Sequence, residues 1–303
     1  GCNSKVYNQR ICYRICDMSK TLAEASTVEE FMADMVQFYK DFGVGKLGLN
    51  KAFSIEHGKD GKPVITPITR IAHVNLDDLV GYEIPKQKLI ENTEAFVRGR
   101  KANNCLLFGD AGTGKSSSIK GILNRYYDEG LRIIEVYKHQ FQDLNDVIAQ
   151  IKNRNYKFIL YMDDLSFEEF EIEYKYLKAV IEGGLEKKPD NILIYATSNR
   201  RHLVREKSGD KLEVADDEDL HSSDTVQEKL SLVYRFGVRI YFGAPNKKEF
   251  QNIVTTLAER YGVTMPAEEL LMKANAWELS HGGLTGRTAQ QFIDHVLGTS
   301  EEQ

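Results

Sequence analysis

Hydrophobic residues near the start of the chain recur every three or four positions, which predicts a helix from Lys20 to Lys40. One face of this helix is hydrophobic. We expect that face to pack in a core, with a partner-binding surface as the alternative. The hydrophobic positions are Leu22, Val28, Phe31, Met32, Met35, Val36 and Tyr39.

Two short hydrophobic runs follow at 52–56 and 64–69, and a turn that contains two glycines separates them at 58–61. This pattern predicts a β-hairpin. Together with the preceding helix, the hairpin is expected to form a small separate α+β module over residues 1–75.

From residue 76 onward, short hydrophobic runs alternate with helical patterns. Such alternation predicts the α/β class, with a five-stranded parallel sheet sandwiched by helices, and we expect this core over 76–245. Ligands of such sheets bind at the carboxyl ends of the strands. The predicted strands are Cys105–Phe108, Arg132–Val136, Phe158–Met162, Ile192–Ala196 and Val238–Phe242.

The last part of the chain, 246–303, has a helical pattern throughout. Phe250 and Leu257 fall on one face of a helix that Gly262 ends, and Thr285 is a suitable N-cap for the last helix. We therefore expect a small helical domain after the α/β core.

The composition is that of a globular protein, because 42% of the 303 residues are hydrophobic and no run is long enough for a transmembrane helix. The net charge of −5 gives no global basic field for nucleic acid, although a local basic face stays open. The four cysteines have no metal-site spacing and suit a reducing cytoplasm. We find no signal peptide, but the chain opens with Gly1 rather than Met, so we expect its natural N-terminus further upstream.

The strongest chemical signal is the P-loop pattern G-x-x-x-x-G-K-S between the first core strand and a predicted helix. Glycines let the backbone curl so that N–H groups point at phosphate oxygens, and the helix adds the positive end of its dipole. We expect Lys115 to reach the β- and γ-phosphates of ATP and Ser116 to bind Mg²⁺. A chance glycine-rich turn is the alternative. The residues expected at the nucleotide are Gly109, Asp110, Ala111, Gly112, Thr113, Gly114, Lys115, Ser116 and Ser117.

A hydrophobic strand that ends in two acids, Asp163 and Asp164, comes 48 residues after Lys115, with one strand between. This arrangement is typical of a Walker B motif. We expect Asp163 to hold Mg²⁺ with Ser116, and Asp164 to orient and polarise the attacking water. A solvated strand end is the alternative.

Three further polar residues complete the candidate site. Asn199 follows the next strand, where its amide could bond the γ-phosphate or the lytic water, although alone it would be a turn former. Arg235 precedes the last core strand and Arg287 opens the last helix. Either guanidinium could stabilise phosphate charge, with a surface ion pair as the alternative.

A basic cluster that could contact a nucleic-acid backbone or a neighbouring subunit consists of Arg200, Arg201, His202 and Arg205.

In this order, the motifs resemble an AAA+ ATPase module over about residues 76–303. The segment 79–83 resembles the one that contacts adenine in such proteins, which implies that Val80 and Gly81 lie at the base. More narrowly, the runs at 163–167, 196–203 and 228–232 resemble a bacterial family of uncharacterised predicted AAA+ ATPases that carries a domain-of-unknown-function label.

The resemblance implies that Asn199 is the sensor-1 residue, Arg287 the sensor-2 residue and Arg235 an arginine finger offered to a neighbouring subunit. Asp164 departs from the family, which usually has glutamate there. Its shorter side chain moves the carboxylate back by roughly one bond length, so we expect slow turnover. Tyr234 also departs, because related sequences often carry a polar or acidic residue at that position.

These features imply an ATP- and Mg²⁺-dependent enzyme that works as a homo-oligomeric ring or open spiral and remodels or loads a protein or nucleic-acid client. A second hypothesis is a nucleotide-dependent switch that hydrolyses ATP rarely. A third is a small-molecule phosphotransferase, which the lack of an arginine-rich lid and of an acceptor-binding signature disfavours. No membrane partner is expected.

Overall fold

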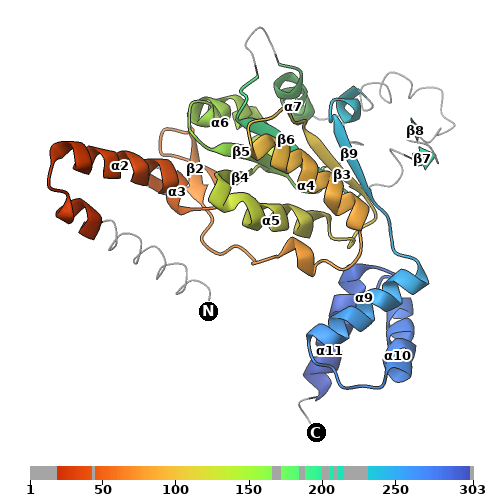
Figure 1. Cartoon of the computed structure of the whole chain (residues 1–303). Helices are drawn as coiled ribbons and strands as arrows, with labels where there is room; N and C mark the ends of the chain where they lie inside the picture. The colour runs from red at the N-terminus through yellow and green to blue at the C-terminus, as the bar shows by residue number, and fades with distance from the viewer. Residues whose placement is uncertain are drawn as a thin grey trace, which may run out of the picture.

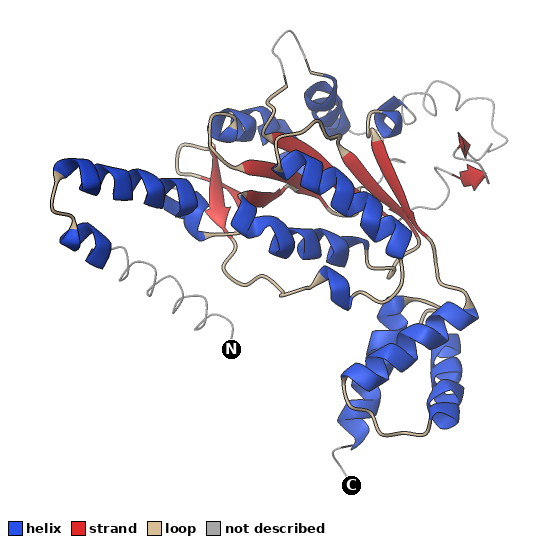
Figure 2. Ribbon diagram, viewed as in Figure 1, coloured by secondary structure: helices blue, strands red, loops and turns tan. Residues whose placement is uncertain are grey.

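The computed structural model describes residues 19–42, 45–165, 172–183, 188–199, 205–207, 211–213 and 231–300. Helices cover both faces of a mostly parallel sheet, and a group of helices lies beyond one end of it (Figure 1, Figure 2). Within the described residues, no helix is both long and apolar enough to cross a bilayer. The helices are α2 (Val28–Phe42), α3 (Gly45–Leu49), α4 (Glu83–Val97), α5 (Lys115–Tyr126), α6 (Leu144–Ile151), α7 (Ile172–Glu182), α9 (Lys247–Arg260), α10 (Ala267–Ser280) and α11 (Gly286–Ser300).

The main sheet has seven strands in the described part of the chain, in the order β2-β1-β4-β5-β6-β3-β9. Six of them run parallel, and the five from β4 to β9 across the sheet confirm the predicted α/β core. This order places β6 between β5 and β3, so the ends of these three strands meet at one edge. The strands are β1 (Ala52–His57), β2 (Pro63–Pro67), β3 (Cys105–Gly109), β4 (Leu131–Glu135), β5 (Lys157–Met162), β6 (Ile192–Ser198) and β9 (Val238–Phe242), with a separate pair β7 (Arg205–Lys207) and β8 (Lys211–Glu213).

The hairpin β1–β2 belongs to the main sheet, so the prediction of a separate module over residues 1–75 is wrong for this segment. β1 pairs with β4 in parallel, with Phe53 opposite Ile134. Phe53 and Ile65 are buried in the same hydrophobic core as the central strands. The physical reason is that β4 would otherwise end the sheet with unpaired backbone groups, which β1 satisfies.

Two hydrophobic cores flank the sheet. On one face, α4 and α5 pack through residues such as Leu89 and Ile119. On the other face, α6 and α7 pack through residues such as Val147 and Leu177. The strands between these layers are almost wholly buried, as a parallel sheet covered on both faces requires.

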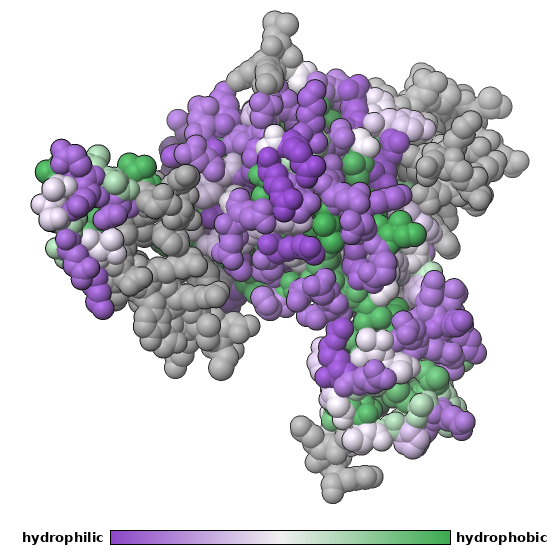
Figure 3. All heavy atoms as spheres, in the orientation of Figure 1, coloured by the Kyte–Doolittle hydropathy of each residue, from purple (hydrophilic) through white to green (hydrophobic). Residues whose placement is uncertain are grey.

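Helix α2 differs from its prediction in its start and in its burial. It begins at Val28 because the Thr27 hydroxyl accepts a hydrogen bond from the Glu30 amide at 3.1 Å, which is an N-cap. Val28 is 73% exposed, and Met32 and Val36 are also exposed, so packing of this stripe in a core is wrong for these residues. Hydrophobic side chains show at the outer, N-terminal end of α2 in the space-filling view (Figure 3).

The C-terminal helices α9, α10 and α11 form a bundle, here called the lid, with a core of its own. The Asn246 side chain caps α9 by accepting a hydrogen bond from the Glu249 backbone amide at 2.9 Å. The Glu249 carboxylate in turn accepts a hydrogen bond from the Asn246 backbone amide. The predicted cap is confirmed, since Thr285 accepts a hydrogen bond from the Thr288 amide at 3.0 Å. Val80 packs against the lid core, so the lid contacts the segment that precedes α4.

Candidate nucleotide-binding site

The glycine-rich loop joins β3 to α5 at the carboxyl edge of the sheet. Gly109 has φ of 130°, and a side chain there would run into the carbonyl oxygen of Phe242 on the neighbouring strand β9. Glycine at this position therefore lets the chain leave the sheet close beside β9. α5 begins at Lys115, so its N-terminal end faces the cavity that the loop borders.

Lys115 lies folded against this loop. Its ammonium donates to the backbone oxygen of Asp110 at 2.5 Å, and its side chain is almost wholly buried. Burial lowers the pKa of Lys115 to about 8, although the carboxylates of Asp110 and Asp164 act in the opposite direction. A phosphate at this end of the cavity would supply the negative charge that favours the protonated amine.

Three hydroxyl groups converge on one carboxylate oxygen, Oδ1 of Asp163. Tyr161 and Thr197 each donate to it at 2.6 Å, and Ser116 donates at 2.8 Å. Ser116 comes from the first turn of α5, whereas the other two lie on β5 and β6. The structure therefore brings the two predicted metal-binding residues, Ser116 and Asp163, into direct contact.

The donor set fits Mg²⁺. Desolvation alone would raise the pKa of Asp163, but the hydrogen bonds from Thr197, Tyr161 and Ser116 outweigh it and leave this pKa below its usual value. The group is thus a carboxylate at neutral pH. Mg²⁺ prefers hard oxygen ligands and is commonly held by one or two carboxylates plus substrate phosphates. Among the described residues, no group of three or more His, Cys, Asp or Glu is placed to hold a metal ion.

Asp164 and Asn199 form the next layer of the site. Asp164 has φ of 52°, a left-handed backbone that is uncommon outside glycine. The backbone amide of Asp164 donates a hydrogen bond to the Thr197 hydroxyl at 2.9 Å. The carboxylate of Asp164 accepts one from the Asn199 side-chain amide at 2.9 Å. The predicted water-activating acid is therefore oriented by the end of β6, and a left-handed backbone is typical of functional positions.

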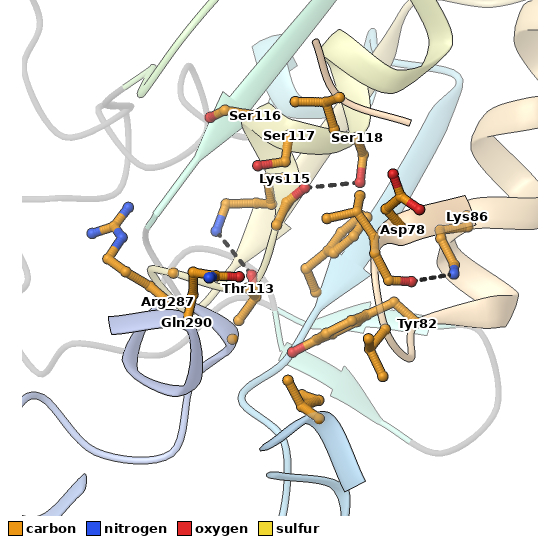
Figure 4. Close-up of a pocket in the computed structure, with 18 of the residues that line it drawn as sticks. Asp78, Tyr82, Lys86, Thr113, Lys115, Ser116, Ser117, Ser118, Arg287 and Gln290 are labelled. Atoms are coloured by element: carbon orange, nitrogen blue, oxygen red, sulfur yellow. Dashed lines mark hydrogen bonds between the residues drawn. The ribbon is translucent and has the colours of Figure 1, made fainter. Parts of the chain in front are cut away.

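The lid reaches the loop through Arg287. Its backbone amide donates to the Gly112 oxygen at 3.1 Å, and a side chain on Gly112 would press against Thr285 and Arg287. The Arg287 side chain extends toward the end of the cavity that holds Lys115, while Tyr82 lies toward the other end (Figure 4). The lid arginine and the loop lysine thus face the same region.

The cavity has a volume of about 660 Å³. Val80 and Tyr82, from the segment before and at the start of α4, and Ile253 and Leu257 from α9 form the apolar part of its wall. The charged residues Asp78, Lys86 and Arg260 line the cavity as well. A flat apolar base fits such a wall. The structure does not place Gly81 on the wall. Gly81 has φ of 79° and lies in the turn between Val80 and Tyr82, which do line the cavity.

Arg235 lies outside the cavity. It is absent from the described residues of the wall, and its guanidinium forms an ion pair of 2.5 Å with Glu182 at the end of α7. The side chain stays 37% exposed. The sequence-predicted site therefore divides into residues that converge in one chain and an arginine that does not join them. The basic cluster at 200–205 lies outside the residues whose side chains are described.

Residues 49–300 match the family described as "Protein of unknown function (DUF815)". The chain belongs to this family. Its description names no activity, so the DUF815 match places the chain without assigning a reaction. No curated protein matches the chain.

Solved structures show the fold of this DUF815 chain. A variant of RuvB from Thermotoga maritima is 18% identical with a TM-score of 0.52, over 77% of this chain and 68% of that one. The FIGL-1 AAA domain in complex with ADP is 16% identical with a TM-score of 0.50, over 77% and 76%. Orc1 from Aeropyrum pernix in complex with DNA is 14% identical with a TM-score of 0.54, over 75% and 63%. At such identities the likeness concerns the fold alone, and that fold is an AAA+ module.

Three functional candidates in the DUF815 chain escaped the sequence reasoning. Tyr161 precedes Asp163 by two positions on β5, so the alternation of strand side chains could have placed them on one face. Thr197 ends the neighbouring strand, and the same rule of strand ends that selected Asn199 could have selected it. Arg260 donates to the Asp78 oxygen at 2.6 Å and ties the lid to the core, which no local pattern indicates.

Proposed function

We propose that this chain is an AAA+ ATPase that binds ATP with Mg²⁺ in the cavity and hydrolyses it there. One observation carries the proposal: Ser116 and Asp163 are in contact at 2.8 Å, at the same end of the cavity as Lys115 and Arg287. A hydroxyl, a carboxylate and two cations at one end, with apolar side chains such as Val80 and Ile253 elsewhere in the wall, match a nucleoside triphosphate with its divalent cation.

Each residue has a role in this proposal. The loop N–H groups and Lys115 bind the β- and γ-phosphates, and Arg287 adds a second cation from the lid. Ser116 and Asp163 would hold Mg²⁺, which would neutralise negative charge on the phosphates. Asp164 orients and polarises the attacking water, and Asn199 holds Asp164 in place through the bond at 2.9 Å.

Assembly is the second part of the proposal. Arg235 lies outside the cavity of its own chain, as an arginine that serves a neighbouring subunit would. We therefore propose a homo-oligomer in which Arg235 completes the next subunit's site and ATP turnover remodels or loads a protein or nucleic-acid client. Orc1 was solved with DNA, which makes DNA one candidate client to test. The described cysteine, Cys105, is a buried free thiol, as expected for the proposed cytoplasmic setting.

A slow nucleotide-dependent switch is the alternative, and the geometry of Asp164 favours it. The short carboxylate is already bonded to Asn199 and sits on a left-handed backbone. To separate the two functions, the ATPase rate per subunit is measured against protein concentration, with and without single- and double-stranded DNA. A rate that climbs with concentration supports catalysis between subunits. A near-zero rate that ignores concentration and DNA supports the switch.

The first prediction tests nucleotide binding itself. Lys115→Ala deletes the cation that faces the β- and γ-phosphates, so most of the affinity for a fluorescent ATP analogue with Mg²⁺ should be lost. Lys88→Ala, an exposed position on α4 away from the cavity, is the matched control and should bind like the wild type. Unchanged affinity in folded Lys115→Ala protein would overturn the assignment of the P-loop.

A further inference from the structure

One carboxylate oxygen of Asp163 accepts more hydrogen bonds than it has lone pairs. A carboxylate oxygen offers about two lone-pair sites. Oδ1 accepts from Tyr161, Thr197 and Ser116, whereas no described residue donates a hydrogen bond to Oδ2. One of the three donors must therefore be the weakest, and the carboxylate is held from one side only.

Ser116 is the donor most easily released. Its bond is the longest of the three, at 2.8 Å against 2.6 Å for the two others. The Ser116 bond is also exposed, whereas those from Tyr161 and Thr197 are partly buried. When Ser116 turns toward a cation, two hydroxyls remain for the two lone pairs of Oδ1. Tyr161 and Thr197 thus keep the orientation of Asp163 after the serine leaves.

Tyr161 has an unusually close internal control. It lies directly opposite Tyr195 in the parallel pairing of β5 with β6, and both rings belong to the same hydrophobic core. The two hydroxyls point to different partners. That of Tyr195 bonds Asn92 and Thr93 at 2.9 Å each, whereas that of Tyr161 bonds Asp163. Both rings are thus buried in one core, and their hydroxyls have different partners.

We propose that Tyr161, with Thr197, is a positioning residue for the metal-binding carboxylate. Its hydroxyl fixes Oδ1 of Asp163 and keeps Oδ2 available to Mg²⁺ or to the water around it. The inference rests on the proposed Mg²⁺-nucleotide function and deepens it. Partners that orient a metal ligand commonly change metal affinity by about 10- to 100-fold when removed.

The test is a titration of Mg²⁺ into protein that holds a fluorescent ATP analogue, with the binding signal as readout. Tyr161→Phe keeps the ring and removes one hydroxyl. The half-saturating Mg²⁺ concentration should rise about tenfold. Affinity for the analogue in EDTA should stay within about twofold, because the loop and Lys115 are untouched. Tyr195→Phe should leave both quantities at their wild-type values.

A second pair of variants guards against a merely structural effect. Thr197→Val removes the other retained hydroxyl and should also raise the half-saturating Mg²⁺ concentration. Thr197→Ser keeps a hydroxyl, so its half-saturating concentration should stay close to that of the wild type. An unchanged requirement in folded Tyr161→Phe, or an equal shift in Tyr195→Phe, overturns the inference and leaves nucleotide binding standing. If the wild type binds no nucleotide, the proposed function fails and the inference fails with it.

Discussion

Arg287 and Arg235 are both candidate partners for phosphate, yet they stand in opposite surroundings. Arg287 lines the cavity beside Lys115, and no described carboxylate forms an ion pair with it. Arg235 lies outside the cavity and is already paired with Glu182. The first is placed to meet a nucleotide bound by its own chain. The second is held on its own chain where another molecule can approach. Under the proposed function, one subunit holds every part of the site except one charge, which Arg235 of a neighbouring subunit supplies.

The strongest test of this comparison places the Arg235 substitution and a defective pocket on different subunits. Arg235→Ala should cut ATP turnover on the order of 10³-fold while the isolated subunit keeps its ATP affinity. Mixed with Lys115→Ala, it should regain activity, because one subunit then offers an intact pocket and the other an intact arginine. The rate of the mixture, measured where the wild type is assembled, must exceed the sum of the two separate rates. Otherwise Arg235 acts within its own chain or only structurally.

A second prediction concerns chemistry inside the pocket. Asp164→Asn keeps the hydrogen-bonding shape but cannot act as a base, so hydrolysis should fall on the order of 10²-fold with nucleotide affinity retained. Asp163→Asn should instead weaken the dependence on Mg²⁺. Steady-state ATPase assays and Mg²⁺ titrations distinguish the two. Identical behaviour of both variants in both assays would show that the division of roles between these acids is wrong.

The smallest effect is expected for the arginine that stays in its own pocket. Arg287→Ala removes one charged hydrogen-bonding partner of the phosphates, and ATP affinity should fall about tenfold in the isolated subunit. The measurement is equilibrium binding of the fluorescent analogue at a protein concentration too low for assembly. If Arg287→Ala leaves affinity intact while Arg235→Ala lowers it, the assignments of the two arginines are reversed.

The parts of the structure that sequence could predict are those with local causes. The P-loop follows from glycines and a lysine in fixed spacing, and the parallel core follows from hydrophobic runs that alternate with helices. The attachment of β1 to β4 could not be predicted, because a hairpin reads the same whether it stands alone or extends another sheet. The exposure of α2 could not be predicted for a related reason. A hydrophobic stripe such as Val28 to Val36 does not indicate whether another part of the protein packs against it.

The candidate site divides in the same way. Asp163 and Ser116 were predicted to meet, and they do, because strand ends and the P-loop helix converge in any sheet of this order. The ion pair of Arg235 with Glu182 depends on where α7 ends relative to the last core strand, which no spacing encodes. The hydroxyl of Tyr161 was within reach of sequence reasoning, but a tyrosine in a buried strand is ordinarily taken for core.

The outer hairpin has one more consequence, for how the molecule can grow. β2 begins at Pro63 and ends at Pro67, and among the described residues it is the outermost strand beyond β1. Proline has no N–H to offer an incoming strand, so both ends of this edge are blunted against further pairing. Continuous sheets between molecules are thereby discouraged on this side. At this edge, any contact between copies of the chain would use side-chain surfaces, which can separate and re-form without unravelling a strand.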